Sequence, residues 1–192
     1  MMIKELVRKS RSVRRFHEEC PVTKEQLEEL VDLGRLSPCG ANKQYIKYVT
    51  VCTPEKNEQV YRCVAWAGYY KDWDGPEKGE RPAAYIILLR DRLINSSVTV
   101  DEGIAAQSIF LGATDMGLGG CMMMNCDRKK LMEYLELDED RFAISMVIAL
   151  GVPKETVVIE EMKDDNVVYW RDENAVHHVP KRSLEEVLLK QE

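Results

Sequence analysis

Two clusters of basic residues are the groups in this chain best suited to holding an anion. They lie near the two ends of the sequence: Arg8, Lys9, Arg11, Arg14 and Arg15, then Lys181 and Arg182. The chain carries a net charge of −6, so positive charge concentrated at both ends suggests a specific anion held where the ends meet. A phosphate is the natural choice, because guanidinium forks match its oxygens and a helix start adds backbone N–H donors. The alternative is solvated surface, which runs of charge usually form.

The remaining residues indicate neither a metal site nor a protein nucleophile. The six cysteines include no Cys-x-x-Cys pair, and we expect reduced thiols, with Cys121 and Cys126 in the core. His177 and His178 are adjacent, so on a strand they would point to opposite faces and could not share one metal. The sequence has no P-loop, no G-x-S-x-G elbow and no H-E-x-x-H motif. Any chemistry is therefore expected from a bound organic cofactor.

Helices and strands alternate along the chain, according to the spacing of its apolar residues. Thr23 and Gln26 form a capping box at the start of one helix, and Ser183 and Glu186 form another ahead of a C-terminal helix. The other predicted helices cover residues 3–9, 55–65, 100–116 and 128–135. The predicted strands cover residues 48–52, 83–89, 121–124 and 144–150. The charged residues 71–81 hold two glycines and one proline, which predicts an exposed loop.

The longest predicted helix, over residues 100–116, is followed by a glycine-rich turn. Its apolar and small residues leave little polar face, so it should lie deep in the core. The turn is Gly117-Leu118-Gly119-Gly120, which lets backbone approach a flat ligand closely, although most glycine turns only connect elements. It follows a helix and lacks the G-x-G-x-x-G order, so a Rossmann dinucleotide site is disfavoured.

Length and composition indicate one domain over residues 1–192, built as an α/β-type layer structure. The contents of 45% hydrophobic and 31% charged residues are those of an ordinary soluble globular protein. The first residues lack the apolar stretch of a signal peptide, and the charge-free apolar stretches are too short to cross a bilayer. We therefore expect a cytoplasmic protein without membrane contact. Overall acidity, with no aromatics interleaved in the basic runs, argues against nucleic acid as a partner.

Five blocks of the chain resemble the FMN-dependent nitroreductase family, in the family's order. They are Arg11–Phe16, Ser37–Gln44, Asp101–Gly120, Ala149–Pro153 and Val179–Glu186. The first is similar to an R-S-x-R-x-F segment, the second to a P-S-x-x-N-x-Q loop, and the third to the family's long central helix and glycine turn. The fourth matches the A-x-G-x-P that ends a late core strand, and the fifth matches the phosphate-side segment. The resemblance, to a short single-domain member, covers nearly the full chain, and the order of its blocks makes it specific.

The resemblance implies an α+β fold with a central, mostly antiparallel sheet flanked by helices, in an intertwined homodimer with two FMN sites at the interface. One chain would bind the flavin and its phosphate through Arg11, Ser12, Arg14, Lys181 and Arg182. The partner chain would contribute Pro38, Cys39, Gly40, Asn42 and Gln44. Beside the isoalloxazine ring would lie Leu118, Gly119 and Gly120. Arg14 would act in catalysis by stabilising negative charge near flavin N1, and Gly119 by a backbone hydrogen bond to N5.

The implied reaction transfers hydride from NADH or NADPH through flavin N5 to a small electron-poor acceptor, such as a nitro compound or a quinone, in a ping-pong cycle. One alternative is a different reaction in the same fold, namely reductive dehalogenation or flavin breakdown. Another is a non-catalytic flavin-binding protein, and the weakest is a non-enzymatic domain that binds nucleic acid or an anionic surface.

Four departures from the family's pattern bear on the site. Ser10 stands where many members carry another arginine, which thins the phosphate or ribitol contacts. Cys39 and Gly40 stand where serine or a small residue is usual, so side-chain hydrogen bonding there differs. Tyr45-Ile46 replaces a common Pro-Trp pair. The chain also lacks the helical insertions that cover the site in larger members; the aromatic residues 66–73 would cover it instead, or only anchor their loop to the core.

Overall fold

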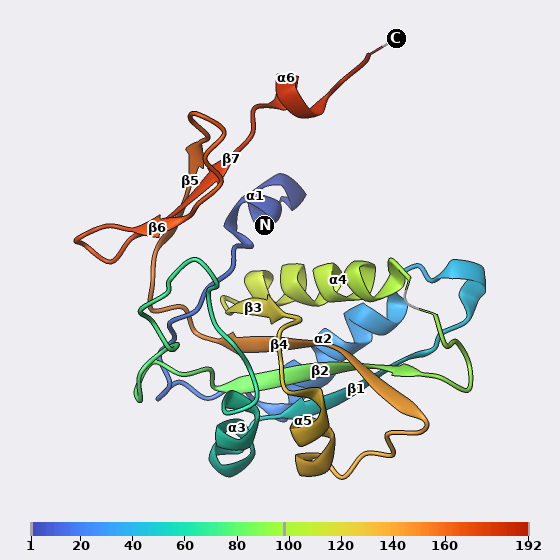
Figure 1. Ribbon diagram of the computed structural model, residues 1–192. Coiled ribbons are helices and arrows are strands. Elements are labelled where there is room, and N and C mark those ends of the chain that lie inside the picture. The colour runs from blue at the N-terminus through green and yellow to red at the C-terminus, as the bar shows by residue number, and fades with distance from the viewer. Residues whose placement is uncertain (1, 98, 192) are drawn as a thin grey trace.

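A four-stranded antiparallel sheet forms the centre of the protein in the computed structural model, which describes residues 2–97 and 99–191. The strands lie in the order β1-β2-β4-β3 (Figure 1). Their bounds are Ile46–Val51 for β1, Ala84–Asp91 for β2, Gly119–Met123 for β3 and Phe142–Gly151 for β4. All three pairings between neighbouring strands are antiparallel. The α+β fold expected from the sequence is therefore confirmed.

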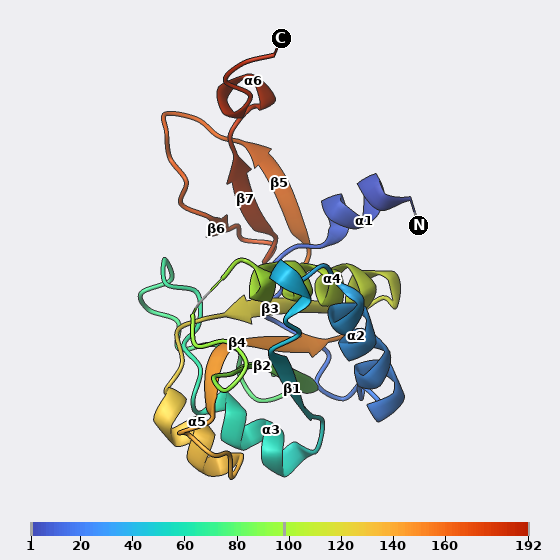
Figure 2. The ribbon, with the colours of Figure 1, turned by 90° about the vertical axis from the view of Figure 1, so that its right-hand side faces the viewer.

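Helices cover both faces of this sheet (Figures 1 and 2). One face carries α2 (Lys24–Leu36) and α4 (Asp101–Asp115), and the other carries α3 (Pro54–Tyr61) and α5 (Arg128–Tyr134). Alternate side chains of β2 explain this arrangement, because Ile86 and Leu88 pack in the α2 and α4 layer while Ile87 and Leu89 pack in the other. The uninterrupted apolar run of β2 is thus a strand buried on both faces.

Local signals set where several helices begin and end. Thr23 Oγ1 accepts a hydrogen bond from Gln26 N–H while Gln26 returns one to Thr23 N–H, so the predicted capping box of α2 is confirmed. Helix α3 starts with Pro54 in its first turn. It ends at Tyr61, earlier than predicted, because the chain then turns to pair with residues before α5, and Ala65 N–H donates to Asn125 O.

Two expectations from the sequence need correction. Helix α4 was expected deep in the core, but only one face is buried, and Ile104 on the other face is 38% exposed. The helix covers one side of the sheet, so its outer face lies open. Residues 71–81 are not wholly exposed either. Gly75 and Pro76 are buried, because the Trp66 ring packs against Gly75 and Tyr61 Oη donates to Pro76 O at 2.8 Å.

The chain beyond β4 rises away from this layered body, next to the N-terminal helix α1 (Ile3–Lys9), as Figures 1 and 2 show. This C-terminal arm, residues 157–191, contains β5 (Val157–Glu161), β6 (Trp170–Arg171), β7 (His177–Lys181) and the short helix α6 (Leu184–Val187). Its strands form a second sheet in the order β5-β7-β6, with β5 and β7 parallel. The sequence analysis predicted no strand here.

Candidate functional site

Cations from the two ends of the chain line one cavity of about 300 Å³, which we call the cationic cavity. The N-terminal segment contributes Ser10, Arg11, Ser12 and Arg14. The arm contributes Tyr169, His177, Val179 and Lys181. The floor comes from the sheet and α4 through Gln107, Phe110 and Met122. The meeting of both basic ends, expected from the sequence, is therefore present in one chain.

The glycine turn holds the N-terminal segment in place. Val13 N–H donates to Gly120 O at 2.7 Å, and Ser12 forms a parallel bridge with Gly120. A Cβ on Gly120 would collide with Ala149 O, and one on Gly119 would lie 2.8 Å from Pro153 Cγ. The glycines thus allow the segment and β4 to pack closely. Leu118, Gly119 and Gly120 do not line the cationic cavity, so their contact with a flavin ring stays a prediction.

The cations of this cavity have no acidic partners among the described residues. Arg11 Nη2 donates only to the Val7 carbonyl, at 2.8 Å, and Arg14 Nη1 faces His177 Nε2 at 3.3 Å. The Nε atoms of both arginines are buried without a hydrogen-bond partner in the described parts of the chain. Lys181, likewise, forms no ion pair with any described acid. Burial lowers the pKa of Arg11. Arg11 and Arg14 are half-buried whereas Lys181 is exposed. Partly desolvated positive charges without counter-charges are costly, so the two arginines mark the cavity as a candidate anion site.

Other arginines near the cavity do have acidic partners. Arg15 Nε lies 2.5 Å from Glu80 Oε2, and Arg171 Nη2 lies 2.8 Å from Glu155 Oε2. Arg182, predicted to bind phosphate, lies outside the lining of the cavity and pairs with Asp165 at 2.8 Å and with Glu186. Its role stays a prediction that this geometry does not support. The structure thus divides the basic residues into those paired with an acid and those without an acidic partner among the described residues.

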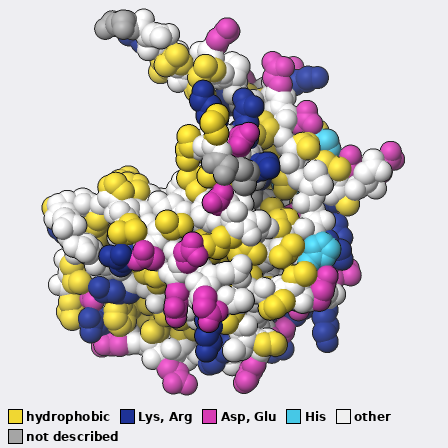
Figure 3. Space-filling model, turned by 180° about the vertical axis from the view of Figure 1, so that it is seen from behind, with side chains coloured by type: hydrophobic (Ala, Val, Ile, Leu, Met, Phe, Trp, Pro, Cys, Tyr) yellow, Lys and Arg dark blue, Asp and Glu magenta, His cyan; other side chains and the backbone are white. Residues whose placement is uncertain are grey.

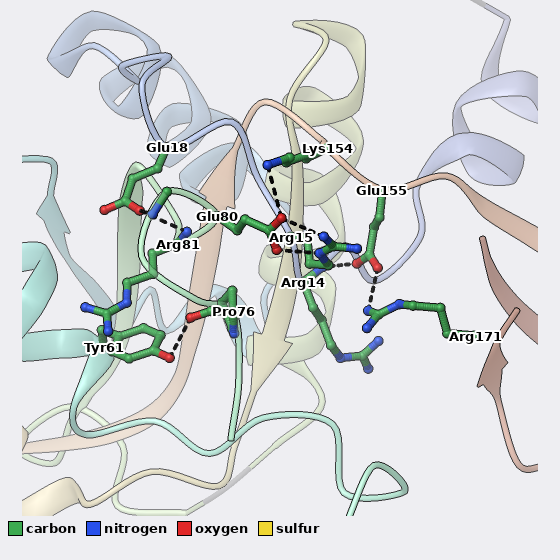
Figure 4. Close-up of polar contacts among 11 residues, drawn as sticks. Arg14, Arg15, Glu18, Tyr61, Pro76, Glu80, Arg81, Lys154, Glu155 and Arg171 are labelled. Atoms are coloured by element: carbon green, nitrogen blue, oxygen red, sulfur yellow. Dashed lines mark hydrogen bonds and ion pairs between the residues drawn. The ribbon is translucent and has the colours of Figure 1, made fainter. Parts of the chain in front are cut away.

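Glu155 anchors Arg14 without neutralising its side chain (Figure 4). The Glu155 carboxylate is fully buried. Its Oε1 accepts a hydrogen bond from the backbone N–H of Arg14 at 2.5 Å, and its Oε2 forms an ion pair with Arg171. The Arg14 guanidinium lies instead over the Tyr169 ring, with 5.0 Å between Cζ and the ring centroid. Arg14 therefore keeps its charge in a fixed place.

A smaller cavity of about 170 Å³ adjoins the first and shares Arg14, Met122 and Tyr169 with it. Its other walls come from the predicted aromatic cover and from β3 with the chain beyond: Ala65, Trp66, Ala67, Gly68, Cys121, Met123, Met124 and Asn125. The buried Trp66 agrees with an anchor of its loop. Tyr70 Oη lies 2.7 Å from His177 Nδ1, and a covering role for residues 66–73 stays a prediction.

The residues expected from a partner chain lie elsewhere, at the start of α4. Pro38, Cys39 and Gln44 line a cavity of about 430 Å³ with Asp101 and Tyr48. It shares no lining residue with the cationic cavity. Gly40, at the edge, donates its N–H to Asp101 Oδ1 at 3.1 Å, and the exposed Asn42 has a positive φ of 51°. Within one chain these residues therefore do not join Arg11 and Arg14.

Asp101 organises this loop. Its carboxylate accepts the Gly40 N–H and the Cys39 thiol, the latter at 3.3 Å. Burial favours the neutral acid, but these hydrogen bonds hold the pKa of Asp101 below its usual value. A charged Asp101 thus fixes the shape of the loop that carries the predicted ligand contacts.

The sequence analysis missed several residues of the cationic cavity, among them Tyr169, His177, Gln107 and Met122. The sequence did predict that the adjacent His177 and His178, if on a strand, would point to opposite faces. This prediction is confirmed: His177 is 1% exposed and faces the cavity, while the partly exposed His178 pairs with Glu160 and stacks on Trp170. No pattern marked Tyr169 or Glu155.

The described residues contain no group of three or more His, Cys, Asp or Glu side chains that could hold a metal. All six cysteines are free thiols, and Cys121 is buried while Cys126 is half-buried. Burial raises the pKa of both thiols, as expected of packed rather than reactive cysteines. In the described chain, no helix has the length and apolarity needed to span a membrane.

Comparison with known proteins gives a consistent result. The model of the Nitroreductase family matches residues 7–152, most of the chain. The protein MhqN of Bacillus subtilis (strain 168), whose name assigns it provisionally as an NAD(P)H nitroreductase, is 28% identical, and the match covers 78% of this chain and 87% of MhqN.

Solved structures share the fold. A provisionally assigned nitroreductase in complex with FMN from Desulfovibrio desulfuricans has a TM-score of 0.70 at 19% identity, over 100% of this chain and 98% of the other. An FMN-dependent nitroreductase from Clostridium difficile R20291 has a TM-score of 0.65 at 23% identity, over 85% and 92%.

Proposed function

The chain belongs to the nitroreductase family, and on that premise we propose that it is an FMN-dependent oxidoreductase that takes its electrons from NADH or NADPH. The relative MhqN is named for NAD(P)H, and two solved structures with this fold are described with FMN. Those names motivate the proposal, and the chain's own cations support it.

The single observation that carries the proposal is the set of uncompensated cations in the cationic cavity. Arg11, Arg14 and Lys181 come from both ends of the chain and have no acidic partner among the described residues. A phosphate would supply the missing negative charge and accept the unused N–H groups. Ser10 fits the same picture, because its buried Oγ has no hydrogen-bond partner in the described chain. The residues present therefore fit the phosphate of FMN.

In this assignment, Arg11, Ser12 and Lys181 would hold the phosphate side of FMN. Arg14, Met122 and Tyr169 belong to both adjoining cavities and would border the flavin ring. When bound, FMN would supply hydride transfer, from NAD(P)H to an electron-poor acceptor such as a nitro compound or quinone, in a ping-pong cycle. A fixed, unneutralised charge at Arg14 favours the more negative state of a nearby ligand, which keeps Arg14 as our candidate for raising the flavin's reduction potential.

We also propose an intertwined homodimer as the working form. Figure 3 shows hydrophobic side chains on the projecting arm and on the body below it. At α1 and along the arm, the exposed apolar side chains include Met2, Ile3, Trp170, Leu184, Val187 and Leu189. Apolar groups on a segment that projects into water favour burial against another surface. A second copy that packed along α4 would bring Pro38, Cys39, Gly40, Asn42 and Gln44 to the cationic cavity of the first.

The protein would act as one domain over residues 1–192, in the cytoplasm.

Purified protein tests the proposed function directly. We expect bound or added FMN to give the yellow absorption of oxidised flavin, NADH or NADPH to bleach it without oxygen, and a quinone or nitro compound to restore it. Bound flavin that neither nicotinamide bleaches would favour a non-catalytic flavin protein. Protein that takes up no FMN would refute the proposal.

A further inference from the structure

His177 lies where the N-terminal segment, the C-terminal arm and the aromatic residues 66–73 meet. Its Nε2 is 3.3 Å from Arg14 Nη1, and its Nδ1 is 2.7 Å from Tyr70 Oη. The ring is also packed against Tyr169, with 5.1 Å between centroids. With only 1% of the residue exposed, these contacts replace water as its hydrogen-bond partners.

Only one protonation state of His177 satisfies both polar contacts. A guanidinium group donates hydrogen bonds and cannot accept them, so Nε2 opposite Arg14 must carry a lone pair. The ring proton then resides on Nδ1 and is donated to Tyr70 Oη. Burial lowers the pKa of His177 to about 4; the Glu155 carboxylate opposes this effect, and the charges of Arg14 and Arg171 add to it. The neutral ring that the geometry requires is therefore the stable form near neutral pH.

A neutral hydrogen-bond acceptor leaves the positive charge of Arg14 uncancelled, which an acidic acceptor would not. A carboxylate in the place of His177 would orient Arg14 equally well but would cancel its charge. The nearby carboxylate of Glu155 is instead occupied by the Arg14 backbone N–H and by Arg171. His177 thus fixes Nη1 of the Arg14 guanidinium. The Nε–H of Arg14 has no partner among the described residues and stays available for a ligand.

We propose that His177 is a positioning residue which, as the neutral Nδ1–H tautomer, holds the Arg14 guanidinium toward bound FMN without neutralising it. The proposal rests on the proposed function for the identity of the ligand. Tyr70 completes the arrangement from the aromatic segment, because it accepts the Nδ1 proton that defines the tautomer.

The tautomer can be measured without any ligand. Long-range ¹H–¹⁵N NMR spectra of the imidazole rings in isotope-labelled protein should show His177 neutral, with its proton on Nδ1, at pH 7. The ring should stay neutral when the pH is lowered somewhat below 6.5, the usual pKa of histidine. A proton on Nε2, or a charged ring at neutral pH, would overturn the proposal. This result stands even if the protein binds no FMN, which would refute the proposed function alone.

Two substitutions test what the tautomer does for Arg14. Glutamine presents an acceptor oxygen and a donor nitrogen, so His177→Gln should bind FMN with a Kd close to that of the wild type. Phenylalanine keeps the ring packing but has no acceptor, so His177→Phe should raise the Kd about tenfold or more. Fluorescence titration of flavin-free protein measures both, with thermal unfolding as the check on folding.

The outcomes separate cleanly. Equal Kd values for wild type and a folded His177→Phe would remove His177 from the positioning role, as would an equal weakening by the Gln and Phe variants. If His177→Phe does not fold, the wild-type tautomer and the glutamine variant decide the question.

Discussion

At the scale of single residues, the partner of each cation separates our candidate ligand-binding groups from structural ones. Arg14 and Arg15 are neighbours in the sequence, yet Arg15 pairs with Glu80 while the Arg14 side chain contacts two uncharged rings, His177 and Tyr169. Lys181 lines the cationic cavity, whereas Arg182 next to it pairs with Asp165 and Glu186. Surface ion pairs such as those of Arg182 contribute little energy, but they occupy the side chain. The sequence shows these charges without showing their partners.

The pair Lys181 and Arg182 therefore gives a matched test. Lys181→Ala should raise the Kd for FMN about tenfold, because it removes a charge-assisted contact. Arg182→Ala removes the same charge one residue away and should leave the Kd nearly unchanged. Titration of both flavin-free variants at two salt concentrations measures the effect. A larger loss in Arg182→Ala would restore the sequence-based assignment of Arg182 to the phosphate.

At the scale of elements, Glu80 ties the loop after the aromatic segment to the N-terminal segment (Figure 4). Its carboxylate contacts Arg15 through two hydrogen bonds of 2.5 and 2.6 Å and Lys154 at 3.0 Å. Phe16 N–H also donates to Glu80 O at 2.9 Å. Because Arg15 follows Arg14 directly, this contact fixes the backbone from which Arg14 reaches the cavity.

The charge of Glu80 should make this contact sensitive to pH. The hydrogen bond from Arg15, reinforced by Lys154, lowers the pKa of Glu80 from 4.5 to about 2. A lowered carboxyl pKa means stability that is present above pH 4.5 and lost as the pH falls toward 2.

Glu80→Gln should reduce the free energy of unfolding by on the order of 1–2 kcal/mol at pH 7 and flatten its dependence on pH in that window. The exposed Glu77 nearby supplies the control, since Glu77→Gln makes the same charge change without breaking the pair. Denaturant unfolding at several pH values gives both numbers. An unchanged pH profile in Glu80→Gln would show that the pair does not stabilise the fold.

How far the sequence predicts these elements depends on the range of the interactions. The start of α2 follows from Thr23 and Gln26, which are only three residues apart, and the buried strand β2 follows from its own apolar run. The arm was missed because β6 has two residues and β7 pairs with β5 across intervening chain. Both basic ends were predicted to meet, but the ring of Tyr169 and the carboxylate of Glu155 have no local signal.

At the scale of the whole molecule, the exposed surfaces of the arm and α1 support the proposed dimer. They project from the body (Figure 2), and α1 has no buried residue. The outer face of α4 is open as well, with Ile104 partly exposed. A second copy would cover these surfaces and supply the loop around Pro38.

Light scattering should give a mass of twice the 22.1 kDa of the chain. A double variant, Val187→Asp with Leu189→Asp, places charge on two strongly exposed apolar positions of the arm and should yield monomer that loses FMN. Glu185→Ala, a change at an exposed polar position of α6 close to both sites, should leave the dimer intact. Wild-type monomer with full flavin occupancy would contradict the proposed assembly.

The central claim is that unpaired cations from both ends of the chain hold the phosphate of FMN, and riboflavin, which lacks that phosphate, tests it most directly. Titration of flavin-free protein with each compound at low and moderate salt would compare the two Kd values. The account predicts that FMN binds at least about a hundredfold more tightly than riboflavin, with a margin that narrows as salt increases. Equal affinity for the two flavins would contradict it.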